Sequence, residues 1–285
     1  MQHLRYDVFG DIHGHKASLE LALSSLGYSY SNGAWRHDYA FALFVGDFAD
    51  RGPDPFGVFD LVAAMVRERA AAAVIGNHDF NLLALLTPNQ AKPGRYLRTR
   101  TDRHVTQSQT TLQQAERDPA RAAAICNWIK ATPLLIEASA FRIVHACPET
   151  DALRRLSGRL KSDWSIGDNY PILADLASRN PTGDDRALVL SGPEYELPAG
   201  ETYLDNEGIE RTFDRVHWWR DDRYRGSVPT FFGHYALKGD VARVFPEANA
   251  VCVDAGCGKG GPLAVYTYRP NRPLTEAAFA YFPQI

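Results

Sequence analysis

Three short segments of the chain combine glycine with residues that bind metal ions or phosphate. They read Gly10-Asp-Ile-His-Gly14, Gly46-Asp-Phe-Ala-Asp-Arg-Gly52 and Gly76-Asn-His-Asp79. Each segment follows a short apolar run, and a glycine removes the Cβ that would obstruct close packing of a loop around a metal ion or a phosphate. The first candidate metal ligands are therefore Asp11, His13, Asp47 and Asn77.

Two later segments repeat the pattern of an apolar strand followed by a histidine, and they end at His145 and His234. Mixed ligation by aspartate, asparagine and histidine suits Mn, Fe, Zn or Co better than Ca or thiolate-binding metals. Six such ligands suffice for two ions that share one bridging carboxylate, the arrangement that clamps a phosphoryl group during in-line displacement. Taken singly, each segment could also be an ordinary turn or a buried core histidine.

These ligands require elements that bring distant parts of the chain together. The apolar patterns predict strands at Tyr6–Phe9, Tyr39–Val45 and Ala72–Ile75, with helices at Lys16–Leu26 and Phe56–Arg69 between them. Such alternation implies right-handed crossovers and a largely parallel sheet. Because the carboxyl ends of parallel strands meet at one edge, the three glycine-containing segments are expected to form one site.

The rest of the chain is less regular. A helical run is expected from Asn81 to Leu86, while 88–118 is polar and basic and is expected to be a cap or loop. From 157 to 214 there are many Pro, Gly and Asp residues and little periodicity. No repeat or linker is visible, which predicts a single domain over 1–285 with insertions at about 88–120 and 150–228. Further predicted elements are a helix at Ala120–Lys130 and strands at Leu134–Ile136, Phe141–Val144, Thr230–Phe232, Ala250–Val253 and Leu263–Tyr268.

Composition limits the classes of partner. The formal net charge of −3 and a pI near 6.3 give no basic field, so stable nucleic-acid binding is not expected, although Arg95–Arg100 could form a local basic groove. The most apolar window, Phe56–Ile75, contains Asp60 and the run Arg67-Glu-Arg69, and cannot span a bilayer. The four cysteines form no CxxC pair, which is typical of reduced thiols in a cytoplasmic protein.

In this order, the segments GDIHG, GDFADRG, GNHD, VHA and FGH resemble the metal-binding blocks of the calcineurin-like metallophosphoesterases. The resemblance is strongest to the phosphoprotein phosphatases and the symmetrical diadenosine tetraphosphatases. It covers residues 6–81, 126–147 and 230–268, but neither insertion. It implies an α/β fold in which two mixed sheets, flanked by helices, form a four-layer α-β-β-α sandwich.

The resemblance also implies roles for individual residues. Asp11 and His13 would hold a first metal ion, Asp47 would bridge two ions, and Asn77, His145 and His234 would complete the second site. The expected cofactors are two divalent ions, with Mn preferred and Fe, Zn, Co or Ni as alternatives. His78 would lie on the leaving-group side and protonate the departing oxygen, with Asp50 orienting its ring. Arg51 would grip the phosphate through two guanidinium donors, while a metal-activated water attacks.

Some residues depart from the phosphoprotein-phosphatase pattern. The chain has GNHD and His145-Ala-Cys where those enzymes typically have GNHE and His-Gly-Gly, and no motif places a second phosphate-binding arginine. We expect Asp79 to be structural. Lys259, in a glycine-rich turn, is a further weak candidate for phosphate binding. Trp164, Trp218 and Trp219 could stack on a nucleobase, although core packing is the preferred interpretation for the last two.

These observations give one expected function and two alternatives. The expected activity is hydrolysis of phosphate monoesters in a small phosphorylated substrate or a phosphopeptide, because Asp50-Arg51-Gly52-Pro53 keeps an aspartate that would orient an acid for an alkoxide leaving group. The first alternative is hydrolysis of a phosphoanhydride in a dinucleoside polyphosphate of the diadenosine tetraphosphate type. A remote alternative is a non-catalytic metal-binding scaffold. The sequence leaves the oligomeric state open.

Overall fold

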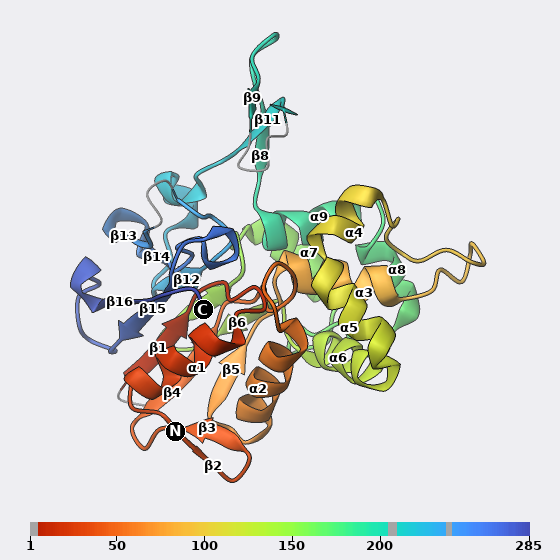
Figure 1. Ribbon diagram of the computed structural model, residues 1–285. Helices are drawn as coiled ribbons and strands as arrows, with labels where there is room; N and C mark the ends of the chain where they lie inside the picture. Colours follow the sequence, from red (N-terminus) through yellow and green to blue (C-terminus); the bar gives the residue numbers. More distant parts are fainter. Residues whose placement is uncertain (1–4, 205–209, 238–240) are drawn as a thin grey trace.

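The computed structural model describes residues 5–204, 210–237 and 241–285, and it contains two five-stranded sheets (Figure 1). The first sheet has the order β16-β15-β1-β4-β5, with β1, β4 and β5 parallel. The second has the order β13-β14-β12-β7-β6, with β7, β12 and β14 parallel. In the first sheet, β15 runs antiparallel to both β1 and β16, and in the second sheet the edge strands β13 and β6 run antiparallel to their neighbours. The strands are β1 (Arg5–Phe9), β4 (Ala40–Phe44), β5 (Ala71–Ala73), β6 (Leu135–Glu137), β7 (Arg142–Val144), β12 (Thr230–Phe232), β13 (Arg243–Phe245), β14 (Ala250–Cys252), β15 (Leu263–Tyr268) and β16 (Phe279–Phe282).

A shared apolar core holds the two sheets face to face. Alternate residues of a strand point to opposite faces of its sheet, and Tyr6 and Val8 of β1 join one buried cluster with Phe141, Ile143 and Phe231 from the second sheet. The ring centroids of Tyr6 and Phe141 are 4.8 Å apart. The predicted pair of stacked mixed sheets is therefore confirmed.

Each sheet is also covered on its outer face. Helices α1 (Lys16–Ser25) and α2 (Pro55–Arg67) pack on the first sheet (Figure 1). The second sheet is covered in part by a short 3₁₀-helix, η1 (Trp218–Arg220), whose Trp219 ring stacks 4.8 Å from the ring of Phe245. Trp218 and Trp219 are buried, as core packing predicts, so neither ring is available to stack on a nucleobase.

The stretch 88–120, expected to be a cap or loop, is helical from Asp102 onward. It contains α4 (Asp102–Gln107) and α5 (Gln109–Arg117), and it leads into α6 (Pro119–Ala131). Helix α5 buries Thr111, Leu112 and Ala115 and exposes mainly polar residues, so its apolar stripe is too narrow to give a clear periodic signal.

The second insertion, 150–228, is also more regular than expected. It contains α7 (Thr150–Ser157), α8 (Tyr170–Leu176) and α9 (Pro181–Ser191). The last two begin with an asparagine cap, Asn169 or Asn180, followed by a proline in the first turn, but each is too short for its periodicity to stand out.

An arm of two short ribbons follows α9 and projects from the body of the protein (Figure 1). In it, β8 (Glu194–Glu196) pairs with β11 (Phe213–Arg215), and β9 (Tyr203–Leu204) pairs with β10 (Glu210–Arg211). A further hairpin joins β2 (Ser29–Ser31) to β3 (Ala34–Arg36).

Helix α3 (Asn77–Leu86) begins four residues before the predicted helical run. Asn77 and His78 therefore lie at its amino-terminal end rather than in a loop. Among the residues that the structure describes, no helix is both long enough and apolar enough to cross a membrane.

Candidate metal centre

The predicted ligands meet where the parallel strands of both sheets end. Asp11 follows β1, Asp47 follows β4, His145 follows β7 and His234 follows β12, while Asn77 begins α3. The carboxyl ends of these strands face one another across the sandwich, so segments more than two hundred residues apart become neighbours. The backbone N–H of His234, for example, donates to Asp11 Oδ2 at 3.0 Å.

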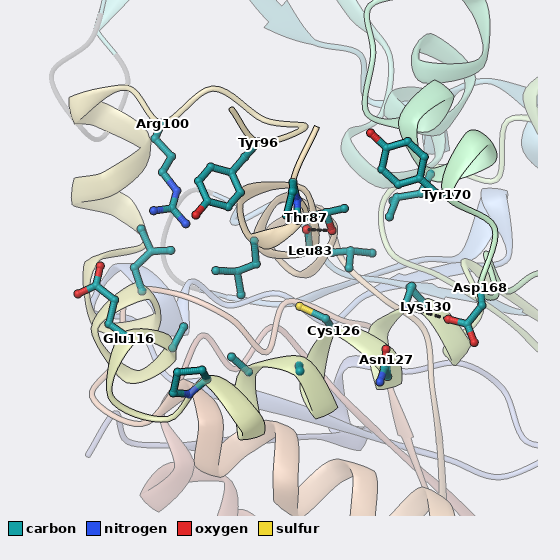
Figure 2. A pocket seen from close by; sticks show the side chains of 18 of the residues that line it. Leu83, Thr87, Tyr96, Arg100, Glu116, Cys126, Asn127, Lys130, Asp168 and Tyr170 are labelled. Atoms are coloured by element: carbon teal, nitrogen blue, oxygen red, sulfur yellow. Dashed lines mark hydrogen bonds and ion pairs between the residues drawn. The ribbon is translucent and has the colours of Figure 1, made fainter. Parts of the chain in front are cut away.

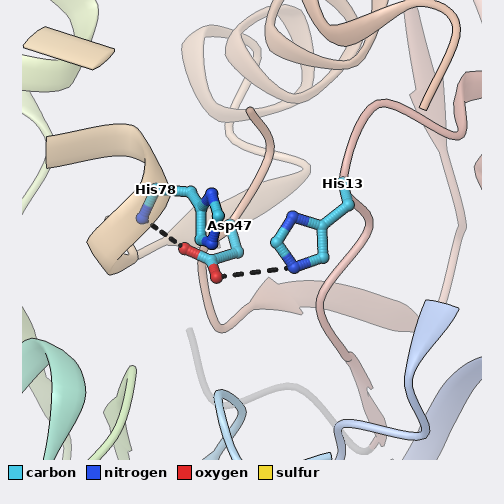
Figure 3. A group of neighbouring side chains, drawn as sticks. All are labelled: His13, Asp47 and His78. Carbon is cyan, nitrogen blue, oxygen red and sulfur yellow. Dashed lines mark hydrogen bonds and ion pairs between the residues drawn. The ribbon is translucent and has the colours of Figure 1, made fainter. Parts of the chain in front are cut away.

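One group of metal-competent side chains consists of His13, Asp47 and His78, with ligand atoms all within 4.8 Å of one another (Figure 3). His13 Nε2 lies 3.6 Å from Asp47 Oδ2. The other ring nitrogen of His13 lies 3.0 Å from the Ala49 carbonyl, which fixes the ring with Nε2 toward the carboxylate. The backbone N–H of His78 donates to the second oxygen of Asp47 at 2.9 Å.

A second group consists of Asp47, His145 and His234, again with ligand atoms within 4.8 Å of one another. His145 Nδ1 lies 2.8 Å from the Val45 carbonyl, and its Nε2 lies 3.4 Å from Asp47 Oδ2. The Asn77 amide oxygen lies 3.1 Å from His145 Nε2 and 2.8 Å from His234 Nδ1. Asp47 belongs to both groups, as a carboxylate that bridges two ions must.

The site contains buried polar atoms that suit a cation. Among the described residues, Asp11 Oδ1 and His234 Nε2 are buried without a hydrogen-bond partner. Burial and the neighbouring carboxylate of Asp254 raise the pKa of Asp11 well above its usual range. A divalent cation would satisfy these atoms and stabilise the carboxylates, so the residues present fit such an ion.

The candidate histidine ligands differ in how their surroundings shift their pKa. Burial disfavours the charged ring of His145, but Asp47, Asp11 and hydrogen bonds together outweigh it and raise the pKa of His145 to about 10. Burial lowers the pKa of His13 and of His234 well below the usual range, which leaves both rings neutral and able to act as ligands.

The backbone at the centre is strained. Five residues of the site, none of them glycine, have left-handed conformations with φ between 46° and 70°. Each such residue costs on the order of 1–3 kcal/mol and persists only where the surroundings impose it, which is typical of functional sites. The five residues are His13, Asp47, Asp50, Arg51 and His234.

The glycines beside the ligands have the role that the sequence predicts. A Cβ on Gly76 would lie 2.0 Å from Asp47 Oδ1, and a Cβ on Gly233 would lie 2.0 Å from Asp11 Oδ1. Both contacts are too short for real atoms, so any side chain at either position would displace a candidate ligand.

Asp79 is buried beneath the centre and holds two of its loops. One carboxylate oxygen accepts hydrogen bonds from the backbone N–H groups of Gly76 and Asp47, at 2.8 and 2.9 Å. The other accepts from Phe48 and Ala49, at 2.9 and 3.0 Å. The structure therefore gives Asp79 the structural role expected from the sequence.

His78, a member of the first metal-competent group, also forms a pair with Asp50. His78 Nδ1 lies 2.7 Å from Asp50 Oδ2. Burial opposes the charged ring, but Asp47 and Asp50 outweigh it and raise the pKa of His78. Thr111 of α5 donates its hydroxyl to Asp50 Oδ1 at 3.0 Å. Sequence analysis missed Thr111 because it lies in the stretch that was expected to be irregular.

Cationic side chains surround the centre. Arg51 Nη1 donates to the carbonyl of Gly258 at 3.3 Å, and Arg215 Nη1 donates to the carbonyl of His234 at 3.2 Å. Burial lowers the pKa of Lys259, and the nearby charges of Arg51 and Arg215 lower it further. Arg215, which no sequence motif had singled out, therefore lies beside the candidate ligand His234.

A further acidic residue, Asp254, was also missed. It is buried and lies close enough to Asp11 to raise the pKa of that carboxyl. A signal for it was available, because Asp254 follows the apolar strand β14 and precedes Ala-Gly, much as Asp11 and Asp47 follow their strands.

The profile of the calcineurin-like phosphoesterases matches residues 4–257, which covers every candidate ligand in the order described above. The chain belongs to this family. The resemblance predicted from the five motifs is confirmed, and so is the predicted fold class.

Two relatives in sequence and one solved structure show what this chain is similar to. An asymmetrical bis(5'-nucleosyl)-tetraphosphatase of Oceanobacillus iheyensis is 37% identical over 99 residues, which is 34% of this chain and 40% of that protein. A symmetrical bis(5'-nucleosyl)-tetraphosphatase of Ralstonia nicotianae is 28% identical over 238 residues, covering 77% of each chain. A protein serine/threonine phosphatase of Saccharomyces cerevisiae shares the fold, with 16% identity, a TM-score of 0.58, and coverage of 99% of this chain and 80% of that one.

Proposed function

We propose that this protein is a metal-dependent hydrolase that cleaves phosphoanhydride bonds in dinucleoside polyphosphates. The observation that carries the proposal is the carboxylate of Asp47, which is shared by two groups of buried metal-competent side chains. A carboxylate shared by two groups of ligands is not needed to hold one structural ion. It suits two neighbouring ions that act on the same phosphoryl group. Family membership and the names of the relatives support the same reaction class.

Two divalent ions would be held by the residues of the centre. In this proposal Asp11 and His13 bind one ion, Asn77, His145 and His234 bind the other, and Asp47 binds both. Mixed oxygen and imidazole donors favour Mn, with Fe, Zn, Co or Ni as alternatives. When bound, such ions supply Lewis acidity toward the phosphoryl group and activation of a water nucleophile.

His78 is proposed to donate a proton to the departing oxygen. Its Nδ1 is tied to Asp50 at 2.7 Å, which leaves Nε2 to carry the transferable proton. Arg51 is proposed to bind the phosphoryl group under attack, with Arg215 as a second clamp.

The charges around the centre support a substrate with more than one phosphate. Arg51 and Arg215 both lower the pKa of Lys259, so these two arginines lie near that lysine. Arg98 is close enough for the charge of Asp50 to raise its pKa, and the charge of Arg98 in turn lowers the pKa of Arg186. A monoester dianion needs fewer cations than this, whereas a polyphosphate chain would contact several of them.

Hydrolysis of phosphate monoesters is the second candidate. The Asp50–His78 pair favours it, because an alkoxide leaving group needs a proton more than a departing phosphate does. In either case the proposed substrate is a small phosphorylated molecule. The proposed location is the cytoplasm, which the four free thiols support.

One substrate panel separates the two candidates. Diadenosine tetraphosphate, p-nitrophenyl phosphate, nucleoside monophosphates and a phosphopeptide are assayed with Mn, and kcat/KM is compared. We expect the dinucleotide to be preferred by about 100-fold or more, which corresponds to roughly 2.7 kcal/mol of transition-state preference. A higher kcat/KM for any monoester would replace the anhydride proposal. Chromatography of the nucleotide products then shows which phosphoanhydride bond is cleaved.

A further inference from the structure

A cavity of 740 Å³ lies in the helical part of the molecule, outside the metal centre (Figure 2). Its walls come from α3, α5 and α6, and from segments 96–100 and 168–173. Its volume is in the range of sites that enclose small organic ligands, about 300–1,000 Å³. None of the roles described above uses this cavity.

The lining combines apolar side chains with aromatic rings. Leu83, Leu112 and Leu173 provide apolar surface from three different helices. Tyr96 and Tyr170 come from two separate segments of the chain and lie apart from each other along the lining (Figure 2). Apolar surface together with tyrosine rings suits a planar aromatic group such as a nucleobase.

The charged side chains that line the cavity favour a ligand that has no net charge but has hydroxyl groups to donate hydrogen bonds. Lys130 is paired with Asp168, at 2.5 Å, and the Arg100 guanidinium lies 3.9 Å from the centre of the Tyr96 ring. Glu116 brings a second carboxylate to the rim, so two cations face two carboxylates. A polyanion would meet both carboxylates, whereas the hydroxyl groups of a ribose could donate hydrogen bonds to them.

The cavity is also close to the proposed general acid. Leu112 follows Thr111, the residue that holds Asp50, and Leu83 is five residues after His78 on the same helix. Five residues of α-helix correspond to about 8 Å along the axis. A phosphate chain of a dinucleoside polyphosphate can extend over a distance of this order.

We propose that this cavity is a nucleoside-binding site. The nucleoside is either a free molecule or one end of a dinucleoside polyphosphate. The dinucleoside polyphosphate as its source rests on the function proposed above. Cys126 provides a probe, because its thiol lines the cavity and is half-buried, whereas Cys147, Cys252 and Cys257 are buried.

The test measures the rate at which a thiol reagent modifies Cys126 in the full-length, metal-free protein, read by mass spectrometry. It is run at one alkaline pH, because burial raises the pKa of Cys126 to about 11. Adenosine, diadenosine tetraphosphate and tripolyphosphate are added separately. At a ligand concentration ten times the Kd, modification should slow about tenfold.

Each arm has a defined consequence. Protection of Cys126 by adenosine shows that a free nucleoside is enough to occupy the cavity. Protection by the dinucleotide but not by adenosine shows that the occupant is one end of a dinucleoside polyphosphate. No protection by either, or equal protection by tripolyphosphate, overturns the proposal. Because the ions are absent, protection does not depend on hydrolysis. If the metal-loaded enzyme fails to hydrolyse the dinucleotide while protection persists, the proposed function fails and the cavity assignment stands.

A matched pair of tyrosine variants checks the location. Tyr170→Ala removes a ring from the cavity and should raise the nucleoside concentration for half-protection about fivefold or more, the effect of losing one base-stacking contact. Tyr39→Ala, at an exposed tyrosine outside the cavity, should leave that concentration unchanged. Tyr39→Ala should also retain the wild-type rate on p-nitrophenyl phosphate, and thermal unfolding checks that Tyr170→Ala is folded. Equal protection in Tyr170→Ala and wild type would also overturn the proposal.

Discussion

The Thr111 hydroxyl lies 3.0 Å from the Asp50 carboxylate and 3.0 Å from the Asp50 backbone nitrogen, although the two residues are 61 positions apart. Thr111 is fully buried, and Asp50 has the left-handed φ of 70°. One side chain therefore fixes both the carboxylate and the strained backbone of the residue that orients His78.

The Thr111→Val variant tests this link. Valine has a similar shape but lacks the hydroxyl, so Asp50 should lose an anchor worth about 1.4 kcal/mol, and kcat on phenyl phosphate should fall about tenfold. Thr111→Ser keeps the hydroxyl and should restore most of the rate. The measurement is kcat for both variants, with thermal unfolding as a check that each is folded. A purely structural role predicts equal losses on substrates with good and poor leaving groups.

His78→Asn should separate proton donation from binding. If His78 is the general acid, kcat on phenyl phosphate should fall about 10²–10⁴-fold, whereas a substrate whose leaving group departs without a proton should lose much less. Asp50→Asn should have the same pattern more weakly, because it only misorients the ring. Steady-state kinetics on the two substrates provides the measurement. Equal losses on both would remove His78 from this role.

Asp47→Asn should be the most damaging change at any single ligand. Asp47 belongs to both metal-competent groups, so its loss weakens both ion sites, whereas loss of His13 affects one. Elemental analysis after Mn loading should give two ions per wild-type chain and less than one for Asp47→Asn. Asp60→Asn, at an exposed helical aspartate, should bind as wild type does. One ion or fewer in the wild-type protein would contradict the two-ion assignment.

Asp79→Ala should destabilise the fold itself. The variant leaves the N–H groups of Gly76, Asp47, Phe48 and Ala49 without their carboxylate partner. An unsatisfied buried donor costs about 1–3 kcal/mol, so the free energy of unfolding should fall by at least about 3 kcal/mol. Urea unfolding measures this change, with Asp38→Ala at an exposed aspartate as the control. A loss similar to that of the control would contradict the structural role.

Gly233→Ala should displace a ligand without removing it. The added methyl group would lie 2.0 Å from Asp11 Oδ1, so Asp11 or the loop must move and metal affinity should fall. The matched control is Gly158→Ala, where the nearest atom is 3.7 Å away and φ is −77°. Titration with Mn, followed by calorimetry, compares the two variants. Wild-type affinity in Gly233→Ala would show that the contact is relieved elsewhere.

The sequence by itself determined the family and the set of candidate ligands of the centre. Short apolar runs followed by Gly-Asp or Gly-Asn-His are local patterns, and parallel strands place their carboxyl ends at one edge whatever the length of the connections. Asp11, His13, Asp47, Asn77, His145 and His234 could therefore be predicted before any distance was known. The two stacked mixed sheets followed from the same order of motifs.

Only the tertiary structure decided which residues support that centre. Thr111 lies on a mostly polar helix, and Arg215 lies at the base of the projecting arm, so neither has a local pattern that identifies it. Their roles depend on which loop each side chain reaches across the fold, at Asp50 and at His234. Contacts of this kind are set by the packing of the insertions rather than by periodicity, because a single hydrogen bond leaves no repeating signal in the sequence.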